Sequence, residues 1–386
     1  MAMETRREVL REHLGRYLKA SRTGKGVMFD RVSETLGMRR TAVIQAFSRM
    51  RRHDPWKIPP GKRGRKELYG PAVISALRTV WETSGEVCGE LLHSVIPEYV
   101  SALIRDGLWK HGASATALLL RMSEGTVKAK VGAFQKARRK GKGRSTTKPS
   151  DLKEIIPIFT GPWEGKPPGY GQVDTVVHCG HTLAGNMVFT LQYVDTATYW
   201  SIRRAQWNKG EQATKESLSA IRERLPFPMI GAHSDSGGEF INRVMKKWCE
   251  ESDIEQTRSR PYRKNDNAFV EERNGHVVRK HVGYVRLDVP ETVPALNAFY
   301  DVLNRYQNHF IPSQRCIRKE RIGSRYVRRY GKPETPYART IRHPAVSEEV
   351  KKVLRLEHGS LNPLKLKREL DILRKRVFEI QKNSSE

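Results

Sequence analysis

The spacing of apolar residues changes near Gly171, and this change divides the chain into two kinds of structure. Before it, apolar residues recur every three or four positions, as they do in amphipathic helices. After it, short runs rich in Val, Thr and aromatic residues predict strands separated by helices. The 386 residues are enough for several domains at about 100–200 residues each. We therefore expect a multidomain protein with an α-helical N-terminal half followed by an α/β core.

The chain is strongly basic, and most of the excess charge lies in its N-terminal part. Lys and Arg number 71 against 42 Asp and Glu, which gives a net charge of +29 at pH 7. About 31 of the basic residues and about 13 of the acidic ones fall in the first 150 positions. This asymmetry favours a polyanion as partner, with nucleic acid ahead of an anionic membrane surface. No apolar run approaches the ~18 residues of a membrane span, so no membrane association is expected.

Two basic segments rich in Pro, Gly and Ser, at 54–66 and 136–150, predict joints between domains. Each segment either lies along a DNA backbone or serves as a flexible tether. The expected regions are a helix-turn-helix region at 1–66, a second helical DNA-binding region with its linker at 67–150, the α/β core at 151–312, and a basic C-terminal region ending in a helix at 313–386.

Two segments of the N-terminal half predict helix-turn-helix units. Residues 28–50 contain two short helical patterns around Gly37, and residues 114–139 repeat the arrangement. An ordinary pair of antiparallel helices has the same apolar stripe, so the surrounding charge carries the DNA-binding interpretation. Between the units, Pro71 and Pro97 are each expected to open a helix. The residues expected to contact DNA are Arg39, Arg40, Thr41 and Gln45 in the first unit and Lys128 and Lys130 in the second.

From Gly171 the predicted elements follow the order β-β-β-α-β-α-β-α. The expected strands cover 171–179, 186–195, 199–205, 228–235 and 255–258, and the expected helices cover 211–223, 240–252 and a long segment from about 267. This order is similar to that of RNase H-like domains. It predicts a mixed five-stranded sheet.

Three acidic residues have a recognisable placement in this order. Asp174 lies on the first strand, Asp235 ends the fourth, and Glu271 lies on the last helix, 35 residues beyond Asp235. Their segments GQVDT, HSDSGGEF and PYRKNDNAFVEERN resemble the motifs of the DDE integrase and transposase superfamily. The resemblance covers about half of the chain, roughly 145–340, and is strongest to the integrase-core transposases of bacterial insertion sequences.

This resemblance implies an insertion-sequence transposase with an RNase H-like catalytic core. Such an enzyme binds the ends of its element, cuts to leave a 3′-OH and joins that hydroxyl to target double-stranded DNA. Asp174, Asp235 and Glu271 would hold two Mg²⁺ ions about 3.5–4 Å apart, with Asp174 bridging them and Mn²⁺ able to substitute. Since helix neighbours diverge by about 100°, Glu271 rather than Glu272 is expected to face the site.

Further residues around the Glu271 segment are expected to contact DNA: Tyr262, Arg263, Lys264, Arg273, Asn274 and Lys280. The basic and aromatic segment after Pro312 is another candidate for DNA contact. Near the C-terminus, leucines at alternating four- and three-residue spacing predict a helix that packs either on its own chain or on a second copy. Since two DNA ends must meet, we expect a homo-oligomer, at least a dimer on DNA, in the bacterial cytoplasm and nucleoid.

The sequence departs from the superfamily pattern at Ser236, where Asn usually follows the second Asp. The alternatives to a transposase are an RNase H-like nuclease without strand transfer and a non-catalytic DNA-binding regulator derived from a transposase. Asp195 and Glu239 are left outside the predicted site. A zinc site at His178, Cys179 and His181 is not expected, because adjacent strand residues point to opposite faces of a sheet.

Overall fold

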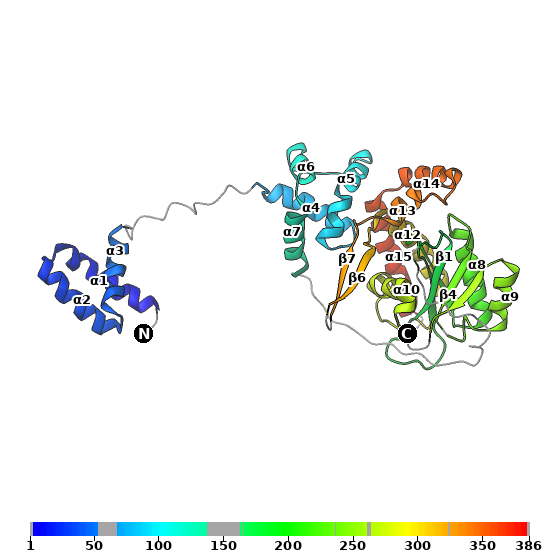
Figure 1. The fold of residues 1–386 in the computed structure, drawn as a ribbon, viewed down its shortest axis with the longest axis horizontal. Coiled ribbons are helices and arrows are strands. Elements are labelled where there is room, and N and C mark those ends of the chain that lie inside the picture. Colours follow the sequence, from blue (N-terminus) through cyan, green and yellow to red (C-terminus); the bar gives the residue numbers. More distant parts are fainter. Residues whose placement is uncertain are drawn as a thin grey trace. The chain divides into compact units, whose positions relative to one another are not determined.

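The computed structural model describes residues 3–52, 68–136, 163, 165–235, 237–260, 264–322 and 325–383, without the side chains of residues 3, 4, 136, 264, 265, 319, 321, 322, 325 and 326. The chain forms two compact units, Met1–Leu68 and Tyr69–Glu386, each described here by itself (Figure 1). Within these described ranges, no helix has both the length and the apolar character needed to cross a membrane.

The first unit is a small bundle of α1 (Met3–Lys19), α2 (Arg22–Leu36) and α3 (Arg40–Arg52). Ser21 caps α2 by accepting a hydrogen bond from the Gly24 N–H at 3.2 Å. Gly37 ends α2 with φ of +59°, a left-handed conformation that glycine adopts at little cost. The two helices expected around Gly37 are therefore confirmed. The core of the unit is made by Leu10, Val32, Leu36, Val43 and Phe47.

The second unit begins with helices α4 (Pro71–Thr83), α5 (Gly89–Arg105), α6 (Ala113–Leu120) and α7 (Glu124–Lys136). Pro71 opens α4 as expected. The expectation for Pro97 is wrong, because this proline lies inside α5. Apolar residues before and after Pro97 are buried along α5, and this packing outweighs the backbone hydrogen bond that a proline removes.

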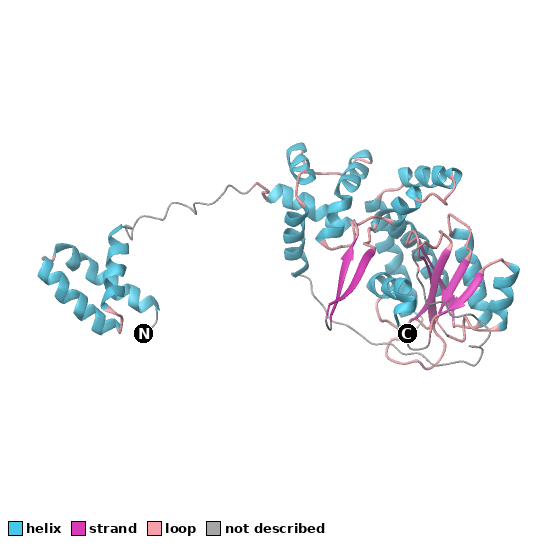
Figure 2. Ribbon diagram, in the orientation of Figure 1, coloured by secondary structure: helices cyan, strands magenta, loops and turns pink. Residues whose placement is uncertain are grey.

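A five-stranded sheet follows, confirming the mixed sheet expected from the sequence (Figure 2). The strand order is β3-β2-β1-β4-β5. Strand β2 runs antiparallel to both of its neighbours, whereas β1, β4 and β5 are parallel to one another. The strands are β1 (Tyr170–Val177), β2 (Val188–Asp195), β3 (Ser201–Trp207), β4 (Gly231–Ser234) and β5 (Glu255–Arg258).

Helices cover both faces of the sheet (Figure 1). Helices α8 (Glu211–Arg224) and α9 (Arg243–Glu251) pack on an apolar face that includes Val173, Leu191 and Tyr193. The opposite face carries α10 (Ala268–Arg273) and α12 (Thr292–Phe310). Because strand side chains alternate between faces, Gln172 and Asp174 lie on this second, more polar side.

The C-terminal helix packs on its own chain. Leu366, Leu370 and Val377 of α15 are buried in a core shared with α4, α5, α7 and α12. Of the two interpretations of the leucine pattern, this packing is the one present in the structure. The remaining elements are the 3₁₀ turn Lys264–Asn267, the π-helical turn Asn274–Arg279, α11 (Lys280–Val282), β6 (Cys316–Ile322), β7 (Arg325–Tyr330), α13 (Pro336–Arg342), α14 (Glu348–Ser360) and α15 (Pro363–Asn383).

Three asparagines of α12 cover the outer edge of β3. The Asn297 side chain accepts from the Ala205 N–H at 2.7 Å and donates to the Ala205 carbonyl at 2.9 Å. Asn304 makes the same pair of bonds with the Arg203 backbone, and Asn308 with the Ser201 backbone. These three backbone positions face away from β2, so the helix supplies the hydrogen bonds that a further strand would otherwise provide.

We predict that Asn304→Ala lowers the free energy of unfolding by about 2–4 kcal/mol, because it leaves both Arg203 backbone groups buried and unpaired. Chemical denaturation measures this loss. Asp301→Ala is the matched control on the same helix. Asp301 forms partly exposed ion pairs with Arg204 and Arg224, so its loss should cost no more than about 1 kcal/mol. Equal losses in the two variants would contradict the role assigned to the asparagine.

A second prediction concerns Asp106, which joins the end of α5 to the start of α15. Its carboxylate accepts hydrogen bonds from Arg105 Nε and Lys365 Nζ, both at 2.7 Å. These partners hold the pKa of Asp106 below its ordinary value. Stability from a depressed pKa is present above the unfolded pKa of about 4 and is lost as the pH falls. Asp106→Asn should therefore unfold at a lower temperature than wild type at pH 7, and this difference in melting temperature should shrink below about pH 4. A difference that is constant with pH would contradict this.

Candidate active site

Asp174 occupies the central strand of the sheet, β1, on the face toward α10. Its Oδ1 accepts a hydrogen bond from the Thr175 N–H at 2.8 Å. Its Oδ2 accepts from Asn274 Nδ2 at 2.6 Å. Both donors favour the ionised carboxylate and fix its orientation.

Asp235 reaches the neighbourhood of Asp174 because β4 is the parallel neighbour of β1. Val173 lies opposite Ser234 in the register, so the two aspartates follow at the same level of adjacent strands. The Gly237 N–H donates to Asp235 Oδ1 at 2.9 Å. Ser236 itself lies outside the described residues.

Glu271 comes from α10, which polar side chains of the sheet hold against it. Gln172 Oε1 accepts from the N–H groups of Phe269 and Val270 at 2.9 and 3.3 Å. Gln192 Nε2 donates to the Val270 carbonyl at 3.3 Å. These bonds use backbone groups near both ends of this short helix and determine where Glu271 lies.

The charges of the other two acids affect the pKa of Asp174. Burial raises it to about 8, and the negative charges of Asp235 and Glu271 contribute to the rise. Like charges close to a partly desolvated carboxylate disfavour its ionisation. The charge of Glu272 affects a different residue, Tyr199. Burial raises the pKa of Tyr199, and the negative charge of Glu272 raises it further. This difference agrees with the prediction that Glu271 and not Glu272 faces the aspartates.

The three carboxylates do not converge on one point. In the part of the chain that the structure describes, no three His, Cys, Asp or Glu side chains are grouped as a metal ion would require. The chemistry of the donors nevertheless fits a hard divalent cation, which prefers carboxylate oxygens. Such a cation would also relieve the repulsion that raises the pKa of Asp174.

Glu239 lies beside this site, although sequence reasoning left it out. Its Oε1 accepts from Thr175 Oγ1 at 3.0 Å, next to Asp174 in the chain. A Cβ placed on Gly237 would lie 2.8 Å from Glu239 Oε2 and 2.9 Å from Asp235 Oδ1. A side chain at position 237 would therefore crowd both carboxylates, and the glycine at this position in SDSGGEF was the signal in the sequence.

Asn274 acts through Asp174. While its amide donates to Asp174, its Oδ1 accepts from Gln192 Nε2 at 2.8 Å. Asn274 also begins the π-helical turn Asn274–Arg279, and such turns are frequent at functional sites. The structure thus places this predicted DNA-contact residue as a positioning residue for the first aspartate.

The other basic residues predicted near Glu271 are only partly at the surface. Arg273 is buried, which lowers its pKa. Lys280 Nζ donates to the Gly85 carbonyl. Tyr262 and Arg263 lie outside the described residues, as does the side chain of Lys264.

The residues predicted to contact DNA from the N-terminal half are placed differently in the two units. In the second unit, Lys128 lies 3.4 Å from Glu90 and 3.6 Å from Glu124, and Lys130 is half-buried. In the first unit, the four residues predicted at the start of the second helix are all exposed: Arg39, Arg40, Thr41 and Gln45.

Two polar groups outside the site have structural partners. Asp195 accepts hydrogen bonds from the Gly169 and Thr198 N–H groups at 2.8 and 2.7 Å, and burial raises its pKa to about 6. His178 contacts Thr190 Oγ1 at 2.8 Å, and Thr190 in turn contacts the Tyr300 hydroxyl at 2.6 Å. The His178 imidazole therefore belongs to a buried polar cluster under α12.

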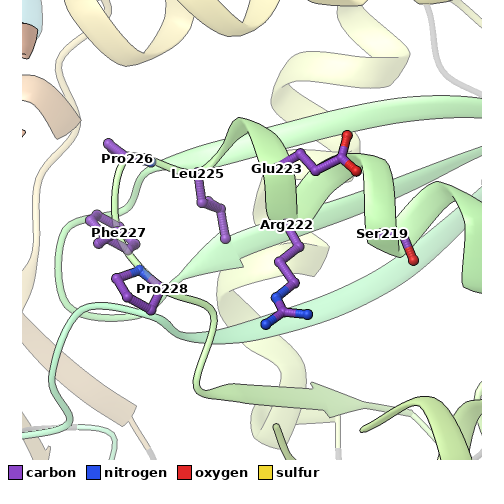
Figure 3. A pocket seen from close by; sticks show the side chains of 7 residues that line it. All are labelled: Ser219, Arg222, Glu223, Leu225, Pro226, Phe227 and Pro228. Carbon is purple, nitrogen blue, oxygen red and sulfur yellow. The ribbon is translucent and has the colours of Figure 1, made fainter. Parts of the chain in front are cut away.

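A surface hollow of about 590 Å³ lies away from these carboxylates. It is formed by the end of α8 and the loop that leads to β4 (Figure 3). Arg222, Glu223 and three prolyl or aromatic residues are among its lining side chains, and none of the three predicted acids belongs to it.

Comparison with known proteins gives one extended match. No protein-family model matches the chain. The chain is 34% identical over 340 residues to the uncharacterized protein y4rM of Sinorhizobium fredii (strain NBRC 101917 / NGR234). The alignment covers 88% of this chain and 96% of y4rM. It therefore spans nearly the whole length of the relative.

We predict that Asn274→Ala raises the pKa of Asp174 above its value of about 8, because it removes a donor to the ionised form. Carboxyl ¹³C NMR of aspartate-labelled protein measures the shift. A raised carboxyl pKa costs stability as the pH rises from the unfolded pKa of about 4 to the folded pKa. Both proteins share this cost up to about pH 8, so the extra loss of stability in the variant should appear above about pH 8, where only wild-type Asp174 ionises. Glu272→Gln, on the neighbouring helical position, serves as the control. An unmoved Asp174 titration in Asn274→Ala would contradict the positioning role.

Proposed function

This chain belongs to the same protein family as y4rM, and we propose that it is a DDE transposase of the insertion-sequence type. It binds the ends of a DNA element and catalyses DNA cleavage and strand transfer. Asp174, Asp235 and Glu271 form its catalytic centre. Double-stranded DNA is its substrate, both as element ends and as target.

One observation carries the proposal: β1, which bears Asp174, pairs in parallel with β4, which Asp235 follows, and α10, which bears Glu271, is hydrogen-bonded to β1 through Gln172. The three acids come from the middle strand, the end of its parallel neighbour and a helix far along the chain. The charges of Asp235 and Glu271 nevertheless both raise the pKa of Asp174. Three separated surface carboxylates would not influence one another in this way.

The sheet gives independent support. Its order, β3-β2-β1-β4-β5 with β2 antiparallel to its neighbours, agrees with the RNase H-like core that the element order suggests. In that arrangement, residues from β1, the end of β4 and the helix after β5 share one edge of the core. The proposed catalytic acids occupy these three positions.

Asp174, Asp235 and Glu271 would hold Mg²⁺, or Mn²⁺ in its place. When bound, such ions activate the attacking oxygen and stabilise the leaving oxygen of a phosphodiester. The side chains around them prepare this site. Asn274 and the Thr175 N–H favour the ionised form of Asp174, and Glu239 places further negative charge beside Asp235.

The reaction needs no nucleophilic side chain. In cleavage, a water oxygen bonds to phosphorus while the P–O bond to the 3′ oxygen breaks and leaves a 3′-OH. In strand transfer, that 3′ oxygen bonds to a target phosphorus while a target P–O bond breaks. Each step exchanges one P–O bond for another, so the same carboxylates serve both.

The first unit supplies the surface proposed for recognition of element ends. At the start of α3, four polar or basic residues are exposed while Val43 and Phe47 are buried. In helix-turn-helix proteins the corresponding part of the second helix contacts base edges and phosphates. Because two ends must be joined, the proposed active form on DNA is at least a dimer.

The test is a strand-transfer assay with a labelled DNA end, a plasmid target and Mg²⁺ or Mn²⁺. We predict joined product with the unaltered chain and a loss of about 10³-fold or more in Asp174→Asn, Asp235→Asn and Glu271→Gln, because each change removes a ligand worth several kcal/mol in the transition state. Glu272→Gln is the matched control and should retain activity within a few fold, since it lies one residue away on another face.

The other outcomes distinguish the alternatives. Cleavage without joining would identify an RNase H-like nuclease. DNA binding with neither reaction would identify a non-catalytic regulator and would overturn the catalytic proposal. If Asp174→Asn forms as much joined product as the unaltered chain, the proposed catalytic centre is also overturned.

A further inference from the structure

Strands β6 and β7 form a two-stranded ribbon that is separate from the five-stranded sheet (Figure 2). Between Cys316 and Tyr330 the sequence has six Lys or Arg and a single acidic residue, Glu320. Arg318, Arg328 and Arg329 are exposed. Both the charge and the exposure distinguish this ribbon from the buried strands of the core.

The pairing of the ribbon opposes like charges. Arg318 lies directly across from Arg329, and the register also places Lys319 across from Arg328. Like charges at directly opposite positions destabilise a strand pair. Glu320 forms an ion pair with Arg318, which leaves the excess of positive charge in place.

Apolar side chains on the ribbon are exposed as well. Ile317 is 62% exposed, Val327 42% and Tyr330 52%. A two-stranded ribbon is by itself at best marginally stable in water. A polyanion lying on the ribbon would offset the repulsion between its arginines and shield these apolar groups.

We propose that the β6–β7 ribbon is a DNA-binding element that lies against double-stranded DNA, with Arg318, Arg328 and Arg329 contacting phosphates. The seven residues of β6 span about 24 Å. The major groove of B-DNA, about 12 Å wide, admits a two-stranded ribbon. The identity of this ligand rests on the proposed function.

The base of the ribbon connects it to the second helical region. Gln314 Nε2 donates to Glu90 Oε1 at 3.0 Å, and Lys128 of α7 lies 3.4 Å from Glu90 Oε2. Arg339 holds the same base by donating to the hydroxyl and the carbonyl of Ser313. Gln314, two residues before β6, and Lys128 of α7 thus share the Glu90 carboxylate.

The experiment measures affinity for a duplex by fluorescence anisotropy at several salt concentrations, with the full chain. The ribbon variant is Arg318→Gln/Arg328→Gln/Arg329→Gln. The control is Arg243→Gln/Lys246→Gln/Lys247→Gln on α9, which also removes three positive charges. Three lost phosphate contacts should reduce the slope of log K against log salt by about 2–3 and weaken binding at least about 10-fold. The control should stay within about 2-fold of wild type.

Two further measurements separate contact from misfolding. The corresponding triple Arg→Lys variant should keep the salt slope of wild type, because it keeps the charge. Hydrogen exchange of the ribbon amides should slow when DNA is added to the unaltered chain. Ribbon and control variants that weaken binding equally, or ribbon amides that DNA does not protect, would overturn the proposal. A preference for duplex RNA over duplex DNA would overturn DNA as the occupant.

The two proposals fail in different ways. If strand transfer is absent while the ribbon variant alone loses salt-dependent binding, the transposase proposal is overturned and the proposal that the ribbon binds DNA is supported. If strand transfer is present and the ribbon variant binds like the control, the ribbon proposal falls alone. An unaltered chain that does not bind DNA overturns both.

Discussion

The hydrogen bonds between α12 and the outer edge of β3 hold the second unit together. An open strand edge exposes backbone N–H and C=O groups that must find partners. Here Asn297, Asn304 and Asn308 satisfy alternate residues of the strand. The other side of α12 joins the core formed by α4, α5, α7 and α15. One helix thus fixes the sheet that bears the acids and the helical region beside it.

The parts of the structure that depend on local pattern could be predicted from the sequence. Runs rich in Val, Thr and aromatic residues predicted the five strands, and Gly37 marked the turn between two helices. Asp174 lies on the first strand and Asp235 directly follows the fourth, as predicted. By contrast, the asparagine bonds to β3 join residues about a hundred positions apart, and no local spacing signals them. Pro97 was misread for the same reason, since its place in α5 depends on tertiary packing.

The sequence predicted the positions of the acidic residues better than it predicted which basic residues are free at the surface. Arg273 is buried, and Lys280 and Lys128 contact groups of their own chain. A basic residue looks the same in sequence whether it contacts phosphate, a carboxylate or a carbonyl. Glu239 shows the converse: it was left outside the predicted site, yet its carboxylate accepts a hydrogen bond from Thr175, the neighbour of Asp174.

The π-helical turn Asn274–Arg279 allows one helical segment to present polar residues to the aspartates and apolar residues to the core. Such a turn takes up one extra residue and so delays the helical phase by about 100°. Glu271, ahead of the turn, and Asn274, at its start, share the side toward the aspartates. Val278, near the end of the turn, and Val282, beyond it, are buried among apolar residues. In an uninterrupted α-helix, Val278 would follow Asn274 on the same side. The extra residue therefore separates a polar, charge-bearing stretch from an apolar one without breaking the chain's helical course.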